Sequence, residues 1–342
     1  MKRKLRGLLL SVSLLFVISA LHIQAETESK YFVRAELPEN QVNKNNSYFD
    51  LLVEPGTQQT IVVHVFNTSN EAIVVNAMIT NAATNTNGTI MYTTKGIHDA
   101  SMAISVEDVA ELKENTVLVE AQSSNIFEIV LTLPDKKFKG VLLGGIVIEA
   151  EDSGNDVISD KQNSIKIENK LTYVIGLKLQ EDLDTVVVPN INYLGTEELL
   201  YDISSAVGIH LQNSEAIIMK GVQVDAEIYR GGTKKLLYEY HNNAVEIAPN
   251  SAFDIAVIWG NEKLKEGTYH LKLRVEFEDY VWEWNEDFEI DGKKANIINS
   301  EAINIKFVMP SWVYYGIGTL IAIILFLAAF LLGRVSKKKR KI

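Results

Sequence analysis

The chain has 342 residues, no cysteine and a formal net charge of -11 at pH 7. An acidic chain repels nucleic acid, so a nucleic-acid-binding protein is excluded. A chain without cysteine has no disulfide framework and no cysteine nucleophile, so disulfide-stabilised domains and cysteine-dependent enzymes are excluded. The hydrophobic fraction of 47% is high enough to build buried cores by packing alone.

The first 25 residues have the pattern of a secretory signal peptide. An apolar run from about Leu8 to Ala20 is followed by the small residue Ala25 at the expected cleavage point. The run is short for a membrane span, which favours cleavage over the alternative of an uncleaved anchor. No cysteine follows it, so a lipoprotein is excluded. The positive residues before the run are Lys2, Arg3, Lys4 and Arg6.

Residues 26–152 predict a first β-sandwich, because β-branched runs alternate with turn residues. One helical turn is expected at Val106 to Leu112, with Ser105 as its N-cap. Gly140, Gly144 and Gly145 flank an apolar strand and predict a bulge or a close backbone approach. The expected strands are Thr60 to Phe66, Ala72 to Thr80, Thr116 to Glu120, Asn125 to Leu133 and Val141 to Ala150.

Residues 153–164 interrupt the strand pattern with polar and acidic residues. This segment predicts an interdomain linker, although a long hairpin loop within one sheet fits the same composition. Its oxygen-bearing side chains also suit calcium, but their spacing departs from the EF-hand pattern, and a solvated hinge explains them without a metal. The residues concerned are Asp152, Asn155, Asp156 and Asp160.

Residues 165–306 predict a second β-sandwich. Arg230-Gly231-Gly232-Thr233 predicts a hairpin turn, because glycine readily adopts positive φ. Asp291 to Ile305 is polar and is read as the approach to a membrane segment. The expected strands are Leu171 to Leu179, Ile203 to Leu211, Gly221 to Tyr229, Ala252 to Ile258, Tyr269 to Phe277 and Val281 to Ile290.

Tyr280, Trp282 and Trp284 alternate along one predicted strand and therefore share one face of it. An outward stripe would form a binding platform for sugar rings or for an apolar protein surface. An inward stripe would be part of the sandwich core. The charge of Glu283 on the opposite face favours the core.

Residues 313–333 form an uncharged apolar run, which is long enough to cross a bilayer as one helix. The basic tail 334–342 follows, and positive flanks stay in the cytoplasm, so a single-pass type I membrane protein with an extracellular ectodomain is expected. Four of the 33 Lys and Arg residues precede the apolar signal run and six lie in the tail. The remaining 23 face 44 acidic residues, which gives the region between them a net charge of -21.

The sequence shows no catalytic or metal-binding motif. No Gly-x-Ser-x-Gly, P-loop, dinucleotide-binding or His-Glu-x-x-His pattern occurs, and each histidine after the signal peptide is isolated. Carboxylates are numerous, so counting does not exclude a glycosidase pair, but nothing singles one out. We expect a non-enzymatic protein without cofactor or metal.

Several short motifs occur in the order typical of one family. The first block contains Tyr48-Phe49-Asp50-Leu51, Glu54-Pro55-Gly56 and Asn81-Ala82-Ala83-Thr84-Asn85, and the second contains Ala248-Pro249-Asn250-Ser251-Ala252-Phe253 and Trp282-Glu283-Trp284. Together with the terminal segments, they resemble the WxL-interacting proteins of Gram-positive bacteria over nearly the whole chain.

The resemblance implies a peptidoglycan-binding first domain, a host-binding second domain and partner proteins that carry a WxL wall-binding domain. A wall or partner site is then expected where amides and aromatic faces combine, and a second partner site at Tyr280, Trp282 and Trp284. Turn formation and packing explain the same residues without a ligand. The first-domain candidates are Asn40, Gln41, Tyr48, Asn81, Asn85 and Tyr92.

The leading hypothesis is a non-enzymatic surface scaffold made of two immunoglobulin-like sandwiches and one transmembrane helix. It would bind peptidoglycan and WxL-domain proteins at the cell surface. The alternatives are a cell-wall glycan hydrolase or its regulator, and an adhesin whose second domain binds host extracellular matrix. Nucleic acid is not an expected partner, given the acidic charge.

Overall fold

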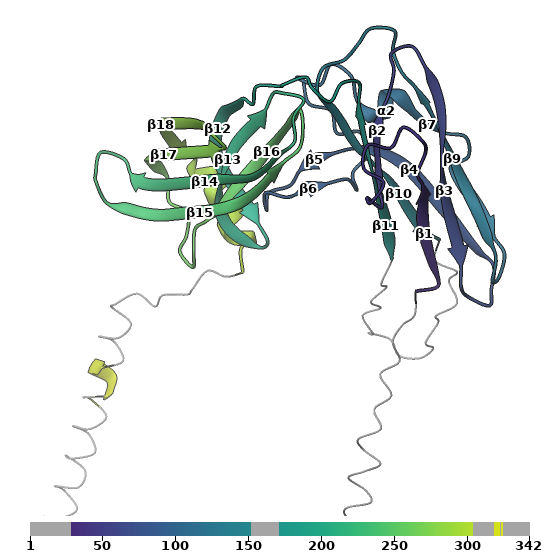
Figure 1. The fold of residues 1–342 in the computed structure, drawn as a ribbon. Helices are drawn as coiled ribbons and strands as arrows, with labels where there is room; N and C mark the ends of the chain where they lie inside the picture. The colour runs from purple at the N-terminus through teal and green to yellow at the C-terminus, as the bar shows by residue number, and fades with distance from the viewer. Residues whose placement is uncertain (1–28, 152–170, 304–317, 322, 324–342) are drawn as a thin grey trace, which may run out of the picture. The chain divides into compact units, whose positions relative to one another are not determined.

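The computed structural model describes residues 29–151, 171–303, 318–321 and 323 (Figure 1). The predicted signal peptide, the acidic linker with its calcium alternative, most of residues 313–333 and the basic tail lie outside these ranges. Among the residues described, no helix combines the length and apolar character needed to span a membrane. The chain divides into two compact units. The first comprises residues up to Ala83, Met91–Val188 and Glu215–Ile217, and the second comprises Thr84–Ile90, Pro189–Ser214 and the residues from Ile218 onward.

The first unit contains two β-sheets. One has the strand order β1 (Tyr31–Glu36), β3 (Gln58–Asn67), β9 (Ser124–Thr132) and β7 (Ala110–Leu112). The other has the order β2 (Phe49–Leu52), β11 (Thr172–Gln180), β10 (Val141–Ala150), β4 (Ile73–Asn81) and β8 (Thr116–Val119). All neighbours are antiparallel except β2 and β11, which run parallel.

The core of the first unit is formed by alternate residues of both sheets. Phe127, Ile129 and Leu131 on β9 and Ile146 and Ile148 on β10 are fully buried. This alternation places apolar side chains inside and polar ones outside, as a sandwich requires.

The short helix α2 (Val106–Val109) carries the predicted N-cap. The Ser105 side chain accepts a hydrogen bond from the backbone N–H of Asp108, and the Asp108 carboxylate accepts one from the N–H of Ser105. This reciprocal capping box fixes where the helix begins.

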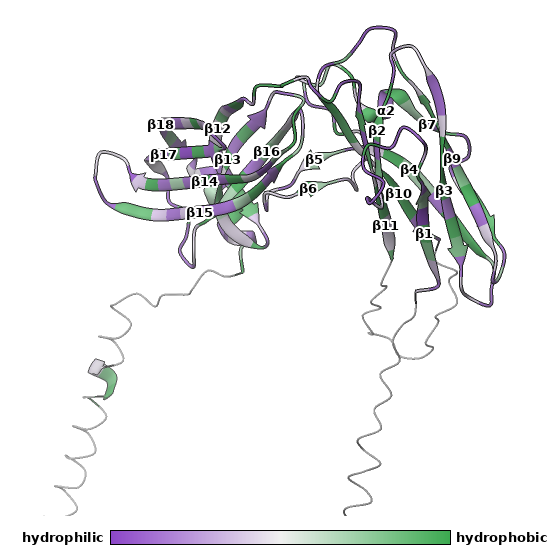
Figure 2. Ribbon diagram, viewed as in Figure 1, coloured by the Kyte–Doolittle hydropathy of each residue, from purple (hydrophilic) through white to green (hydrophobic). Residues whose placement is uncertain are grey.

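The second unit is a sandwich of seven strands. Three form the order β12 (Ile191–Tyr201), β13 (Ser204–Asn213) and β16 (Ser251–Ile258). Four form the order β15 (Leu236–Ile247), β14 (Met219–Arg230), β17 (Gly267–Phe277) and β18 (Tyr280–Ile290). All are antiparallel, and the count and pairing define an immunoglobulin-like sandwich. Hydrophobic and hydrophilic residues alternate along most of β14 (Figure 2).

Three further elements lie outside these sheets. The short strands β5 (Ala83–Thr84) and β6 (Ile90–Met91) pair with each other, and the turn that joins them belongs to the second unit. Helix α3 (Gly292–Glu301) follows β18, and its N-cap Asp291 accepts hydrogen bonds from the N–H groups of Lys293 and Lys294.

The all-β prediction is confirmed, and the predicted strands correspond to observed ones within a few residues. One of them lies in an unexpected place. The sequence assigns Leu171 to Leu179 to the second sandwich, whereas β11 pairs with β10 and β2 in the first unit, where Ile175, Leu177 and Leu179 join the core. Helix α3 lies in the polar segment after Asp291, for which the sequence predicts no helix or strand.

Candidate functional site

Two glycines of neighbouring strands form a smooth area on the outer face of the first unit. Gly145 on β10 is paired with Gly176 on β11. Their neighbours Gly144, Ile146, Ile175 and Leu177 point into the core, so the pair lies on the opposite face. Glycine has no side chain, so other residues can approach the backbone closely here.

Two of the predicted site residues lie on this glycine pair. The ring of Tyr48 packs over Gly176, and Tyr92 lies so close to Gly145 that a Cβ there would be 2.8 Å from the Tyr92 Cβ. The Thr80 hydroxyl donates to the Tyr92 carbonyl oxygen and fixes this loop. Tyr48 is 40% exposed and Tyr92 is half-buried. We name Tyr48, Tyr92 and the exposed Val174 beside them the tyrosine patch.

A buried ion pair lies next to the patch on the same face. Lys178 Nζ is 3.1 Å from Asp50 Oδ1, and Gln180 Nε2 donates to the same oxygen at 3.2 Å. The Asp50 side chain is only 9% exposed and that of Lys178 is 22% exposed. The pairing and the additional hydrogen bond compensate for the removal of the carboxylate from water. The aromatic and apolar groups of the patch thus lie on the outer face of β10 and β11, with this ion pair beside them.

Asn40, Gln41 and Asn81 serve the local structure of the first unit. Asn40 and Gln59 exchange two amide hydrogen bonds, both at 2.9 Å. Gln41 is 5% exposed, and its amide bonds to the backbone of Asn43, Tyr48 and Asp50. Asn81 is 3% exposed and bonds to the carbonyl of Ile97 and the N–H of Glu107. These amides thus bond to neighbouring loops and strands, and their contact with a ligand stays a prediction. Gln41 orients Tyr48 indirectly by holding its backbone.

Asn85 belongs to the second unit and organises a turn. Its Oδ1 accepts hydrogen bonds from the N–H groups of Asn87 and Thr89, both at 3.0 Å. The turn also contains Gly88, which has a positive φ of 72° and whose carbonyl accepts from the N–H of Glu246. This is the behaviour expected of an asparagine in a tight turn.

The first unit also has a mostly polar, open cavity of about 510 Å³ beside β4. Strand β8 pairs with β4 only as far as Asn76, so the following residues of β4 lie at the edge of the sheet. The cavity is bordered by Met78 on β4, by Lys95, and by Glu107 of α2. Strand β4 therefore borders this cavity and also carries Thr80, whose hydroxyl donates a hydrogen bond to the Tyr92 carbonyl oxygen.

The aromatic stripe of the second unit is neither a buried core nor a fully exposed platform. Tyr280, Trp282 and Trp284 share the face of β18 that buries Phe288 and Ile290. Tyr280 is nevertheless 37% exposed, and both tryptophans are half-buried. The expectation of a core stripe is thus wrong for Tyr280 and only partly right for the tryptophans. The reason is that β18 is the last strand of its sheet, where fewer residues cover it.

Tyr193 of the opposing sheet extends this stripe. Its ring lies 6.1 Å from that of Trp284, and the rings of Tyr280 and Trp282 stack at 6.0 Å. The pairing of β12 shifts between Tyr193 and Gly195, which leaves Leu194 bulged and 55% exposed. Bulges redirect side chains at sheet edges. Sequence reasoning misses Tyr193, because the bulge interrupts the strand alternation. We name Tyr193, Tyr280, Trp282 and Trp284 the aromatic row.

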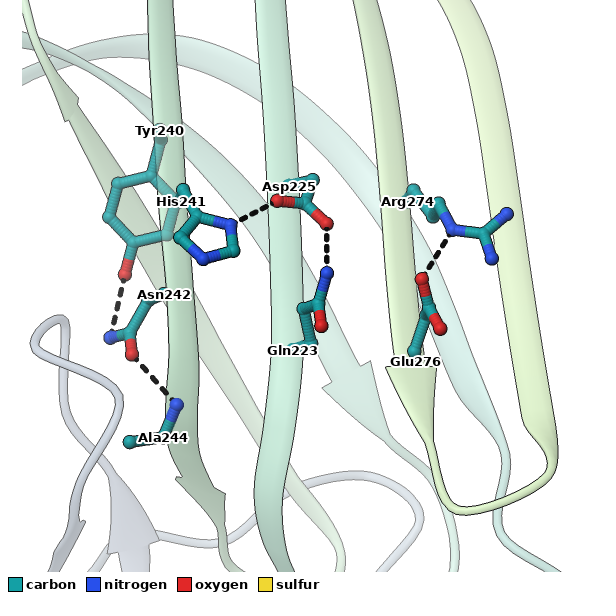
Figure 3. A network of polar contacts seen from close by, with 8 residues as sticks. All are labelled: Gln223, Asp225, Tyr240, His241, Asn242, Ala244, Arg274 and Glu276. Carbon is teal, nitrogen blue, oxygen red and sulfur yellow. Dashed lines mark hydrogen bonds and ion pairs between the residues drawn. The ribbon is translucent and has the colours of Figure 1, made fainter.

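The outer face of the same four-stranded sheet carries a polar network (Figure 3). Asp225 on β14 accepts hydrogen bonds from His241 on β15 and from Gln223, the latter at 2.7 Å. Burial raises the pKa of Asp225, but these bonds outweigh it and hold the pKa below its usual value. Arg274 on β17 donates to Glu276 and also to Glu283 on β18. Of these contacts, that of His241 with Asp225 joins β15 to β14, and that of Arg274 with Glu283 joins β17 to β18.

His270 on β17 makes the second unit sensitive to pH. Its two ring nitrogens lie 2.7 Å from Asp287 Oδ1 and Asn285 Oδ1, and both acceptors are satisfied only when the ring is protonated. These hydrogen bonds, first that to Asp287, raise the pKa of His270 above its ordinary value of 6.5. A raised pKa stabilises the folded state below the unfolded-state pKa, and this contribution is lost as pH rises through the folded-state pKa.

We therefore expect the second unit to unfold at a lower temperature at about pH 8 than at about pH 6, and we expect the His270→Gln variant to show a smaller difference. Calorimetry of the ectodomain at both pH values tests this. A pH dependence that is the same in the variant would contradict the assignment to His270.

Neither unit offers an evident metal centre, since the described residues contain no group of three or more His, Asp or Glu placed to hold a cation. What the geometry defines is a protein of two β-sandwich units with aromatic surface patches suited to binding. The comparisons with known families agree. Residues 31–150 match the peptidoglycan-binding domain of WxL-interacting proteins, and residues 162–300 match their host-binding domain.

The chain belongs to the WxL-interacting protein family. Both matched domains are binding domains, which supports a cell-surface binding protein. No curated protein matches the sequence.

Several solved structures of bacterial fimbrial chaperones are similar to the chain. One belongs to a chaperone–tip adhesin complex of CFA/I fimbriae, with 13% identity, a TM-score of 0.32 and coverage of 77% of this chain and 99% of that chain. The E. coli chaperone DraB has 11% identity and a TM-score of 0.29, and the match covers 76% of this chain and 95% of that chain. The CsuC–CsuE complex of Acinetobacter baumannii has 8% identity, a TM-score of 0.32 and coverage of 67% and 91%. Values this low carry no argument about function.

Proposed function

We propose that this protein is a non-enzymatic, membrane-anchored scaffold of the Gram-positive cell surface. Its first unit binds the glycan strands of peptidoglycan, and its second unit binds protein partners, among them WxL-domain surface proteins. The signal-like N-terminus, the apolar run 313–333 and the basic tail support an extracellular ectodomain held by one C-terminal anchor. A host matrix protein is a further partner that the second domain family supports.

The observation that carries the wall-binding part is the tyrosine patch. Tyr48 and Tyr92 lie within the stretch that matches the peptidoglycan-binding domain, and both rings lie on a smooth glycine pair of one sheet. Aromatic faces suit the apolar faces of sugar rings, while nearby polar groups suit their hydroxyl and amide substituents. The ion pair of Lys178 and Asp50 adds polar groups beside the patch.

We expect Tyr48→Ala and Tyr92→Ala to weaken binding to purified sacculi about fivefold or more each, since a lost aromatic contact costs about 1 kcal/mol. Co-sedimentation of the ectodomain, residues 26–306, measures this. The matched control is Phe32→Ala, because Phe32 is an aromatic residue of the same unit, is 44% exposed and lies on the other sheet.

Two results would contradict the proposed function. If all three variants pelleted like the unaltered ectodomain, the wall site would lie elsewhere. If the unaltered ectodomain pelleted only together with a WxL-domain protein, its wall contact would be indirect. Release of new reducing sugar ends from the sacculi would instead favour the hydrolase alternative.

A further inference from the structure

Strand β18 has one open edge. In the described structure it pairs with β17 only, and no other strand bonds to its backbone. The two strands are joined by the two-residue loop Glu278–Asp279, with Phe277 and Tyr280 paired at its base. In such a hairpin this pair is mutually hydrogen-bonded, and every second pair along the ladder repeats the pattern. The N–H and C=O groups of Val281, Glu283 and Asn285 therefore point away from β17.

Along this edge, the face of β18 that points toward the opposing sheet is apolar and partly exposed to solvent. The aromatic row lies along it, and the exposed Leu194 lies at the bulge of β12 next to Tyr193. A free row of backbone donors and acceptors beside alternate aromatic side chains is what an added β-strand needs. Main-chain hydrogen bonds give such a complex its affinity, and alternate side chains give it specificity.

The charge of the edge determines what kind of strand fits. From Glu278 to Asp291 the chain contains seven acidic residues and neither lysine nor arginine. The outward face of β18 carries Glu283, Asp287 and Glu289 together with Val281 and Asn285, and Arg274 and His270 on β17 offset part of this charge through their pairs with Glu283 and Asp287. Opposite charges placed across neighbouring strands stabilise a sheet, and like charges destabilise it.

We propose that the open edge of β18 binds an extended segment of a partner protein as an additional β-strand, and that this segment alternates basic with apolar residues. Its basic side chains face Glu283, Asp287 and Glu289, and its apolar side chains continue the aromatic row. The inference deepens the protein-binding part of the proposed function and rests on it. It is independent of the tyrosine patch, which belongs to the first unit.

A second copy of the chain does not fit this edge well. Two β18 strands paired with each other would place acidic residues of one strand close to acidic residues of the other. Acidic edges of this kind discourage self-association of sheets. The partner segment must therefore supply the positive charge.

The test uses the whole ectodomain and a labelled peptide that alternates lysine with valine. Fluorescence anisotropy compares its binding to the unaltered protein, to Asn285→Ala and to Asn285→Pro. Both variants lose the side-chain bond to His270, but only proline removes an outward N–H. We expect Asn285→Ala to bind the peptide like the unaltered protein, and Asn285→Pro to bind about tenfold more weakly, which corresponds to about 1.4 kcal/mol.

Two further probes separate strand addition from simple charge attraction. A peptide with the same lysines and a central proline keeps the charge but cannot extend the sheet, so we expect it to bind weakly. If Asn285→Pro melts at a lower temperature than Asn285→Ala, its weaker binding could reflect misfolding. The test then uses a double variant instead, Glu283→Lys combined with Glu289→Lys, which reverses the charge of the edge. That variant is expected to prefer a peptide that alternates glutamate with valine.

Equal binding to Asn285→Ala and Asn285→Pro, or equal binding of the proline-containing peptide, would overturn the proposal. Displacement of the peptide by soluble wall glycan fragments would also overturn it and would assign the aromatic row to sugar. Sacculus co-sedimentation of Asn285→Pro is measured in parallel. It is expected to equal that of the unaltered ectodomain, so a failure of wall binding and a failure of strand addition are distinguishable.

Discussion

A fragment limited to residues 31–150, the extent of the matched peptidoglycan-binding domain, is expected not to fold cooperatively. It lacks β11, which lies between β2 and β10 and supplies Ile175, Leu177 and Leu179 to the core. Without β11, the neighbouring strands lose their hydrogen-bond partner and the buried side chains around it lose their contacts. The longer fragment 29–188, which serves as the control, contains β11 and is expected to melt in one sharp transition.

The complementary fragment 162–300 is expected to aggregate, for two reasons. It carries β11 without the strands that pair with it, so an apolar strand is exposed. It also lacks Thr84, whose hydroxyl accepts a hydrogen bond from the buried N–H of Ala248 and contacts the Ser251 hydroxyl at 2.8 Å. Calorimetry and amide NMR of the three fragments test these expectations. Cooperative melting of 31–150 at the temperature of 29–188 would contradict the role given to β11.

Gly144→Ala is expected to destabilise the first unit by about 3 kcal/mol, the upper end of the usual cost of overpacking a core. A Cβ at this position would lie 2.3 Å from the Thr80 carbonyl oxygen and 2.8 Å from the Val106 side chain. Both neighbours are held in place, Thr80 by the ladder between β4 and β10, and Val106 by the capped helix α2. Urea unfolding of the ectodomain, followed by fluorescence, measures the change.

The matched control is Gly176→Ala on the adjacent strand. A Cβ there would lie 3.6 Å from its nearest neighbour, the Tyr48 Cβ, which is ordinary van der Waals distance. Its free energy of unfolding should therefore stay within about 0.5 kcal/mol of the unaltered protein. Equal losses in the two variants would show that strand propensity, rather than the contact of Gly144 with Thr80 and Val106, sets the cost.

Local pattern was sufficient to predict strands whose buried and exposed residues alternate regularly. β3 and β9 follow the predicted bounds closely for this reason. β12 and β15 were missed, because both contain register shifts that interrupt the alternation and because β12 is largely half-buried. The assignment of β11 to a sheet was beyond local pattern, since a buried strand looks the same whichever sheet accepts it.

The candidate site residues also differ in how far local pattern predicts their role and how far that role depends on strand register. The amide residues Asn40, Gln41 and Asn81 were predicted as ligand groups, yet their hydrogen bonds are to neighbouring loops and strands. Tyr48 and Tyr92 were predicted as aromatic faces, and their shared support became visible only when the register of β10 and β11 paired Gly145 with Gly176. Register between strands far apart in the sequence is set by the whole sheet and not by a short motif.

The late position of β11 in the chain has a consequence for folding during synthesis. The first unit includes Glu215–Ile217, whose Ala216 carbonyl accepts the N–H of Val141 and lies where a side chain on Gly140 would be. As the chain is made from its N-terminus, β10 cannot be paired with β11 until residue 180, the last residue of β11, has been added. Until then β10 lacks its β11 neighbour, and such unpaired strands are prone to aggregate. The order in which the strands are made, and not only the finished structure, therefore determines how long an unpaired strand is exposed to aggregation.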